Sequence, residues 1–197
     1  MTAGDDRPVL DVLRASGAWM EGHFRLSSGL HSSAYLQCAL VLQHPARAAE
    51  LGGAIARELA GTAPSVVLSP ALGGIVIGHE VARALGVRAI FAERESGRLA
   101  LRRGFELEPG ERVLVVEDVI TTGLSTRETI AVAREAGAGV VGAGAIVDRS
   151  DGGAELGVPL IALVNLQVPA WQQAACPLCR QGLPLVKPGS RPEPIGG

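Results

Sequence analysis

Short apolar runs alternate with helical patterns through the middle of the chain. Two segments, 74–85 and 125–136, carry apolar residues at helical spacing, and Gly86 and Gly137 follow them where a helix C-cap is expected. The runs rich in Val, Ile and Leu predict strands at residues 65–69, 87–92, 112–117, 140–147 and 160–164. This alternation predicts an α/β fold with a mostly parallel central sheet, flanked by helices and joined by right-handed crossovers.

The region before this core has a different pattern. Helices are predicted at 9–18 and 45–60, and the Ser/Gly-rich, partly alternating segment between them is interpreted as a small N-terminal hood. After residue 164 the sequence becomes rich in proline. The predicted organisation is a single domain over residues 1–186, with the hood at about 19–43, the core at about 45–165 and a disordered tail at 187–197.

Composition narrows the class of protein. The 197 residues suit one ordinary domain, and a chain with 47% hydrophobic but only 3% aromatic residues must build its core from aliphatic side chains. A net charge of −2 gives no global attraction for nucleic acid or for an anionic membrane, so an anion site must be local. We find no apolar run long enough to cross a membrane and no basic, apolar leader, and we expect a cytoplasmic protein.

The cysteines and histidines give a weak signal. Cys38 is far from Cys176 and Cys179, so reduced thiols are expected rather than a disulfide framework. The CxxC pair has the spacing of a zinc knuckle, but one pair cannot complete a tetrahedral site unless a dimer mate or distant residues supply the rest. The four histidines at 23, 31, 44 and 79 lack ligand spacing and are expected to cap, pack or face solvent. No metal-ligating residue is therefore predicted.

The most specific motif follows the third predicted strand, where RVLVVEDVITTGLST runs from Arg112. In open α/β sheets the ligand crevice lies beyond the carboxyl ends of the strands. Backbone N–H groups from Thr121 to Ser125, at the start of a helix, can hold a phosphate dianion, and Gly123 lets the phosphate approach closely. Two acids beside a phosphate would repel it unless they bind ribose hydroxyls or magnesium. The alternative, solvated acids beside an N-capped helix, leaves two adjacent acids at a strand end unexplained.

This string closely resembles the phosphoribosyl diphosphate signature of type I phosphoribosyltransferases, which has four aliphatic residues, two acids and a Thr/Gly/Ser turn. SPALGGIVIG, from Ser69, resembles the family's pyrophosphate loop, in which a strained peptide points backbone amides at the diphosphate. A Gly-rich helix start is the alternative for this second motif. The resemblance implies the type I phosphoribosyltransferase fold and assigns phosphoribosyl diphosphate binding to Ala71, Leu72, Gly73, Glu117, Asp118, Val119, Ile120, Thr121, Thr122, Gly123, Leu124 and Ser125.

An arginine-rich stretch, FAERESGRLALRRGF, lies between the second and third predicted strands. Without a clear periodicity, it is interpreted as a mobile basic lid that excludes water and neutralises the departing pyrophosphate. An exposed β-hairpin with solvated charges is the alternative. The segment departs from the family's usual lid pattern, so individual contacts are not transferred. The candidate catalytic residues are Glu117, Asp118, Arg94 and Arg98.

The family shares the ribose-phosphate site, so residues outside that site must select the base. In those residues the chain resembles the orotate-specific members of the family. Arg149, directly after the fourth strand, matches their arginine for the orotate carboxylate, although it could instead be a structural partner of Asp148. The N-terminal segment EGHFRLSSGLHSSAYLQ is similar to their hood, but Ser27 stands where they carry a lysine. The candidate orotate-binding residues are Thr121, Arg149, Phe24 and Tyr35.

The resemblance, which extends to about residue 182 and includes CPLCRQG, implies the function. It implies transfer of ribose 5-phosphate from phosphoribosyl diphosphate to orotate, a step of pyrimidine nucleotide synthesis. It also implies Mg2+ bound mainly through the substrate, and a homodimer whose lids close across the two-fold axis. Two alternatives stay open: a purine phosphoribosyltransferase, and a regulator that binds a phosphoribosyl ligand without catalysis.

Overall fold

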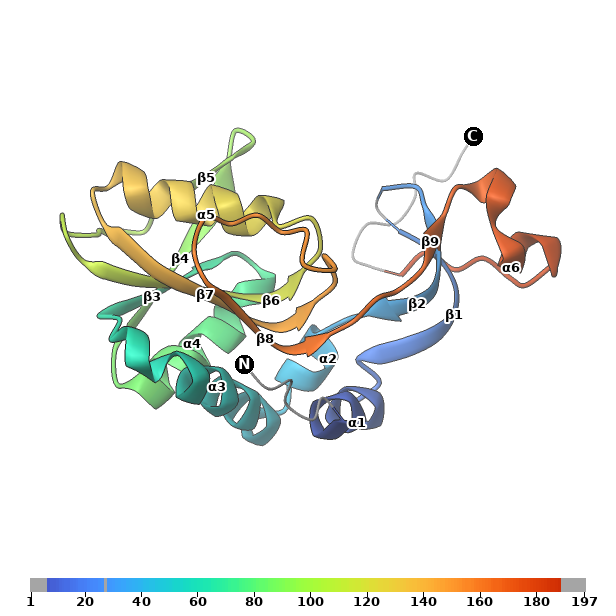
Figure 1. Ribbon diagram of the computed structural model, residues 1–197, viewed down its shortest axis with the longest axis horizontal. Coiled ribbons are helices and arrows are strands. Elements are labelled where there is room, and N and C mark those ends of the chain that lie inside the picture. Colours follow the sequence, from blue (N-terminus) through green and yellow to red (C-terminus); the bar gives the residue numbers. More distant parts are fainter. Residues whose placement is uncertain (1–6, 27, 189–197) are drawn as a thin grey trace.

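A six-stranded sheet forms the centre of the molecule in the computed structural model, which describes residues 7–26 and 28–188 (Figure 1). Its strand order is β5-β4-β3-β6-β7-β8, and five of the strands are parallel while β5 pairs antiparallel with β4 at one edge. The strands are β3 (Val66–Pro70), β4 (Arg88–Glu95), β5 (Arg98–Leu101), β6 (Arg112–Ile120), β7 (Gly139–Asp148) and β8 (Leu160–Asn165). The predicted α/β fold with a mostly parallel sheet is confirmed.

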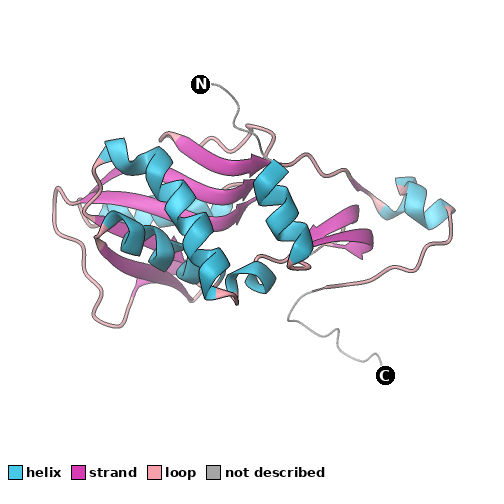
Figure 2. Cartoon of the chain, turned by 90° about the horizontal axis from the view of Figure 1, so that it is seen from below, coloured by secondary structure: helices cyan, strands magenta, loops and turns pink. Residues whose placement is uncertain are grey.

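Helices cover both faces of this sheet (Figures 1 and 2). The helices α3 and α4 pack together on one face, and α5 lies on the other. The helical elements are α1 (Arg7–Ala15), α2 (Ala39–Leu42), α3 (Pro45–Leu59), η1 (Ala60–Thr62), α4 (Gly73–Leu85), α5 (Leu124–Glu135), η2 (Gln173–Ala175) and α6 (Pro177–Arg180). Within the described ranges, none of these helices has the length and apolar character needed to cross a bilayer.

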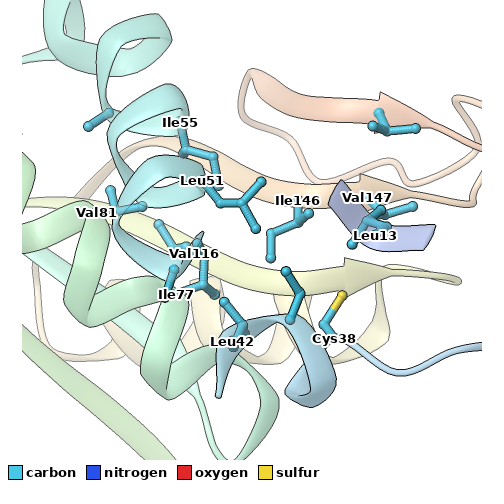
Figure 3. Close-up of a cluster of buried hydrophobic side chains, with 14 of the residues drawn as sticks. Leu13, Cys38, Leu42, Leu51, Ile55, Ile77, Val81, Val116, Ile146 and Val147 are labelled. Carbon is cyan, nitrogen blue, oxygen red and sulfur yellow. The ribbon is translucent and has the colours of Figure 1, made fainter. Parts of the chain in front are cut away.

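The core is divided by the sheet because successive strand residues point to opposite faces. In β3, Val67 faces the cluster under α3 and α4, whereas Val66 and Leu68 join the cluster on the α5 side. The same alternation continues in β6, where Leu114 and Val116 belong to the α3 and α4 side. Figure 3 shows that cluster, formed by the sheet, the helices and the N-terminal elements. Burial on both faces explains why these strands are continuously apolar in sequence.

A second, three-stranded antiparallel sheet lies beyond the carboxyl ends of the core strands (Figure 1). It has the order β1-β2-β9 and consists of β1 (Trp19–Arg25), β2 (His31–Leu36) and β9 (Ala170–Trp171). We call this sheet, with the chain that follows β9 to residue 188, the hood. The sequence predicted an N-terminal hood, but the C-terminal segment contributes its third strand and most of its outer surface.

Several element ends differ from prediction, and two of the differences have a clear local cause. The first helix ends at Ala15 rather than at residue 18, because Gly17 has a φ of 71° and its N–H bonds back to the Arg14 carbonyl, which closes the helix. The Arg-rich segment is ordered as the β4–β5 hairpin, in which Glu95 pairs with Arg98. Ser96 and Gly97 both have positive φ, as a two-residue hairpin turn requires. The predicted tail lies outside the described residues from 189 onward.

Candidate active site

Two carboxylates lie side by side in sequence near the end of β6. Glu117 accepts a hydrogen bond from the Thr126 hydroxyl at 2.7 Å, and Asp118 accepts one from the Val119 N–H at 2.9 Å. Burial raises the pKa of Glu117 to about 7, with the Thr126 hydroxyl opposing the shift and the Asp118 charge adding to it. Burial also raises the pKa of Asp118. These are acceptors held in a low-dielectric site, where hydrogen bonds to a ligand hydroxyl are strong.

The N-terminus of α4 lies directly against one of these acids. A side-chain carbon built on Gly73, the first residue of α4, would lie 2.7 Å from Oδ1 of Asp118. Only glycine therefore lets the loop after β3 and the acids of β6 approach this closely. The two motifs recognised separately in the sequence form one continuous site at the carboxyl ends of the strands.

The loop between β3 and α4 is exposed at the carboxyl ends of the strands, on the side of the two acids. Its Ala71–Leu72 peptide bond is cis, and the Leu72 residue is 83% exposed. The Ala71 N–H bonds to the Ala92 carbonyl of β4, so the loop is fixed to the neighbouring strand.

The turn after β6 encloses a small pocket. Gly123 adopts a φ of 75° as the N-cap of α5, and the free N–H groups of a helix's first turn can bind an anion. Arg127 donates to the Thr122 carbonyl at 3.0 Å and so braces the turn from behind. The pocket is lined by Glu117, Val119, Ile120, Thr121, Thr122, Gly123, Leu124 and Ser125.

Arg149 lies at the end of the neighbouring strand, with its backbone N–H bonded to the Ile120 carbonyl at 2.8 Å. Its side chain is partly buried, and its Nε has no hydrogen-bond partner. Burial lowers the pKa of Arg149, while Tyr35 of β2 opposes that shift. In the ranges that the structure describes, Asp148 accepts from the Ser150 N–H at 2.7 Å and makes no ion pair with Arg149. The structural pairing with Asp148 is therefore absent.

Tyr35 of the hood acts electrostatically on this arginine and favours its charged form. The rings of Phe24 and Tyr35 lie 5.9 Å apart on β1 and β2. A hollow of about 400 Å3 lies beside the ends of β7 and β8, lined by Asp148, Asp151, Gly152, Asn165, Leu166 and Gln167. The predicted base-side residues Arg149 and Tyr35 are thus coupled electrostatically, although 114 positions separate them in the sequence (149 − 35).

The predicted lid is more constrained than its sequence indicated. Arg94 bonds to Glu128 of α5 at 2.6 Å, and Arg103 makes a two-pronged contact with Glu93 at 2.7 and 2.8 Å. Arg102 lies 3.3 Å from Glu95. In the part of the chain that the structure describes, Arg98 is the lid arginine without an ion pair. The interpretation as an irregular segment is wrong, because cross-strand pairing and these acids order it as a β-hairpin, the alternative that the sequence left open; its movement as a lid stays a prediction.

One residue of the site, and a second role of another, were not predicted from the sequence. Thr126 is buried at the first turn of α5, and its hydroxyl orients Glu117. Gly73 was predicted as a ligand-contacting residue, but not as the residue that lets Asp118 pack against α4. The sequence signal for Thr126 was its position directly after the turn at 121–125. Such a position lies in the first turn of the following helix, close to the end of β6.

Comparisons with known proteins agree with this geometry. A family model described as a phosphoribosyl transferase domain matches residues 39–172. The orotate phosphoribosyltransferase of Pelotomaculum thermopropionicum is 55% identical over 183 residues, covering 93% of this chain and 96% of that protein. The crystal structure of orotate phosphoribosyltransferase from Aeropyrum pernix superposes with a TM-score of 0.66 at 30% identity, covering 81% of this chain and 94% of that chain.

A third relative shows the same fold with a substrate bound. The Mycobacterium tuberculosis orotate phosphoribosyltransferase, in complex with 5-phospho-alpha-D-ribosyl 1-diphosphate (PRPP), has a TM-score of 0.64 at 27% identity and covers 83% of this chain and 97% of that chain. This chain belongs to the phosphoribosyltransferase family. Its near-full-length relatives place it in the orotate branch of that family.

Proposed function

We propose that this chain transfers the 5-phosphoribosyl group of PRPP to orotate, forming orotidine 5′-monophosphate and pyrophosphate in the synthesis of UMP. Its orotate phosphoribosyltransferase relatives support the reaction. The observation that carries the choice of base is Arg149, a partly buried guanidinium with an unpaired Nε beside the phosphate turn. A buried donor without a partner is costly, and a planar carboxylate on the base would satisfy it.

Each end of PRPP has a matching part of the site. The N–H groups of the turn after β6 are suited to the 5-phosphate, because α5 directs its positive end into that pocket. The exposed loop from Ala71 to Gly73 is suited to the diphosphate. Between them, Glu117 and Asp118 would accept hydrogen bonds from the two ribose hydroxyls.

The same acids would stabilise the reaction electrostatically. Positive charge develops on the ribose ring as the bond to pyrophosphate breaks, and preorganised carboxylates favour that charge. The carboxyl oxygens of Glu117 and Asp118 also suit a hard cation such as Mg2+, which prefers oxygen ligands. When bound with PRPP, Mg2+ would neutralise charge on the leaving diphosphate.

The hairpin arginines would complete the site from a second subunit. Arg98 at the hairpin tip is available for a diphosphate, whereas Arg94 would first have to leave Glu128. A homodimer in which each hairpin covers the other subunit's crevice fits this arrangement. The cysteines of the described ranges are free thiols, which suits a reducing compartment, and we propose the cytoplasm.

Ultraviolet absorbance tests the function directly. Purified protein with Mg2+ and PRPP would be offered orotate, uracil, adenine, guanine and xanthine in separate reactions. We expect turnover of orotate alone. Turnover of a purine instead would keep the phosphoribosyl site but contradict the role of Arg149, and tight PRPP binding without turnover of any base would indicate a regulator.

A further inference from the structure

Two histidines and two cysteines meet inside the hood. His23 of β1 and His31 of β2 are 4% and 1% exposed, and Cys176 is fully buried. Cys179, on the short helix α6, is partly buried beside them. One ligand atom from each of the four residues lies within 4.8 Å of the others. The expectation that His23 and His31 would merely pack, cap or face solvent did not anticipate this meeting, which depends on tertiary structure.

The distances within the cluster fit a metal-binding geometry. Nε2 of His23 lies 3.5 Å from Sγ of Cys176 and 3.7 Å from Sγ of Cys179, and Nδ1 of His31 lies 3.3 Å from Sγ of Cys179. Around tetrahedral zinc, with bonds of about 2.0–2.3 Å, nitrogen and sulfur donors are separated by roughly 3.3–3.8 Å. The two histidine nitrogens, at 2.9 Å, would separate slightly around an ion.

The surroundings of His23 orient it as a ligand. Its Nδ1 lies 2.9 Å from the Leu183 carbonyl, which can only accept a hydrogen bond, so this nitrogen carries the proton. In the neutral imidazole, the form that binds a metal, Nε2 is then the nitrogen with the lone pair, and it faces the cluster. A backbone carbonyl behind a histidine is the usual support of metal-ligating imidazoles.

The part of the hood after β9 has little apolar burial to hold it in place: within residues 172–188, Cys176 is the one buried residue. The chain after β9 exposes Leu183, Leu185 and Val186 by 44–51%, and it bonds to β1 through the backbone of Val186. Small units with a limited hydrophobic core are commonly stabilised by a metal or a disulfide. The cluster lies where the β1–β2 hairpin meets the C-terminal segment, at the end of the molecule away from the sheet (Figure 1).

We propose that His23, His31, Cys176 and Cys179 form a structural zinc site that fastens the C-terminal segment of the hood to the β1–β2 hairpin. Four protein ligands leave no open position, as in structural rather than catalytic zinc sites. Two thiolates, formed by loss of two protons, balance the charge of Zn2+, so the complete site is neutral and suits a buried location. Because Phe24 follows His23 directly, the metal would also fix the strand that carries a candidate base-binding residue.

Metal content of untagged protein is the first measurement. Elemental analysis after purification without chelators should give about one zinc per chain. Cys176→Ser with Cys179→Ser should reduce it to about a tenth or less, as should His31→Asn. The matched controls, Cys38→Ala and His79→Asn, change a cysteine and a histidine outside the cluster and should keep the zinc.

A second measurement uses the wild-type protein and so tests the proposal even when the variants fail to fold. Zinc would be removed from the wild-type protein with a chelator under reducing conditions and replaced by Co2+, whose absorption reports tetrahedral thiolate ligation. The apoprotein should expose two more titratable thiols than the zinc form and a C-terminal segment more sensitive to protease. Absence of zinc and of the cobalt spectrum, full zinc retention by the double cysteine variant, or a Cys176–Cys179 disulfide in the metal-free native protein would overturn the proposal.

Discussion

The six-stranded sheet and the hood are held together in different ways. In the sheet, the valines at 66 and 67 of β3 and at 113, 115 and 116 of β6 are fully buried between helices on both faces. In the hood, one face of a small sheet meets a C-terminal segment whose apolar residues are half exposed, with the four-residue His/Cys cluster at the junction. The candidate phosphoribosyl-binding motifs lie at the edge of the central sheet, as does Arg149 after β7, whereas Phe24 and Tyr35 belong to the hood. The comparison teaches that the candidate phosphoribosyl site belongs to the sheet alone, whereas the candidate base site draws on both regions.

The largest effect on activity is expected from Asp118→Asn in the sheet. Losing the charge that faces the ribose should remove about 3 kcal/mol of transition-state stabilisation, a roughly hundredfold fall in kcat. Both Michaelis constants should change less. Steady-state kinetics would measure this, with the exposed Glu106→Gln as the control, and an unchanged kcat would reject the role of Asp118.

Arg149→Ala tests the boundary between the two regions. Loss of a charge-assisted contact worth roughly 1.5–3 kcal/mol should raise the Michaelis constant for orotate about tenfold to a hundredfold. The constant for PRPP should change little, and the exposed Arg57→Ala on α3 should leave both unchanged. Equal increases for the two substrates would indicate a structural arginine.

The stability of the folded protein should also depend on pH through Glu117 in the sheet. The substitution Glu117→Gln should reduce this dependence. The folded-state pKa of Glu117, about 7, lies above the usual 4.5, so between these values the native protein holds a proton that the unfolded chain has lost. The contribution of Glu117 to the stability of the unliganded protein is therefore fully present below about pH 4.5 and is lost as the pH rises to about 7. The raised pKa of Asp118 acts in the same direction.

Between pH 5 and 7, we expect the stability of the Glu117→Gln variant to fall by roughly 1–2 kcal/mol less than that of the wild type. Denaturant unfolding at pH 5, 6 and 7 would measure it, and Glu106→Gln is again the control. A variant that loses as much stability as the wild type between pH 5 and 7 would argue that Glu117 is not the titrating group.

The smallest effect is expected in the hood from Tyr35→Phe. Removing a hydroxyl near Arg149 should cost about 0.5–1.5 kcal/mol, a roughly twofold to tenfold rise in the Michaelis constant for orotate. A double-mutant cycle with Arg149→Ala measures whether the two residues act together. Simple additivity of the two changes would show that hood and sheet recognise the base independently.

Local sequence predicted the sheet and the phosphoribosyl site because their determinants are close in sequence. Buried strands need continuous apolar runs, and the turn after β6 carries its acids, hydroxyls and glycine within a single stretch. Parallel strands then bring successive loops to one edge. The family resemblance rested on these same residues, and the comparisons confirm it.

The lid shows where such reasoning was incomplete. The arginine-rich segment has no clear periodicity, so the sequence left both a mobile lid and a β-hairpin open. Pairing of β5 with β4 and contacts to Glu93 and Glu128 make it a hairpin. Glu128 lies 34 positions from Arg94, and no sequence motif marks Glu93 as the partner of Arg103. Neither pairing could therefore be predicted from the sequence. The absence of an ion pair between Arg149 and Asp148 likewise depends on the turn that the Ser150 N–H makes with Asp148.

The sequence by itself determined the α/β architecture, the phosphate turn with its two acids and the arginine that follows β7. Each of these depends on a short pattern of residue types read along one strand and the loop after it. Only the tertiary structure decided that Gly73 must be small against Asp118, and that His23 and His31 meet Cys176 and Cys179. Those contacts join residues 45 to 156 positions apart (118 − 73 and 179 − 23), and only folding determines which distant residues become neighbours.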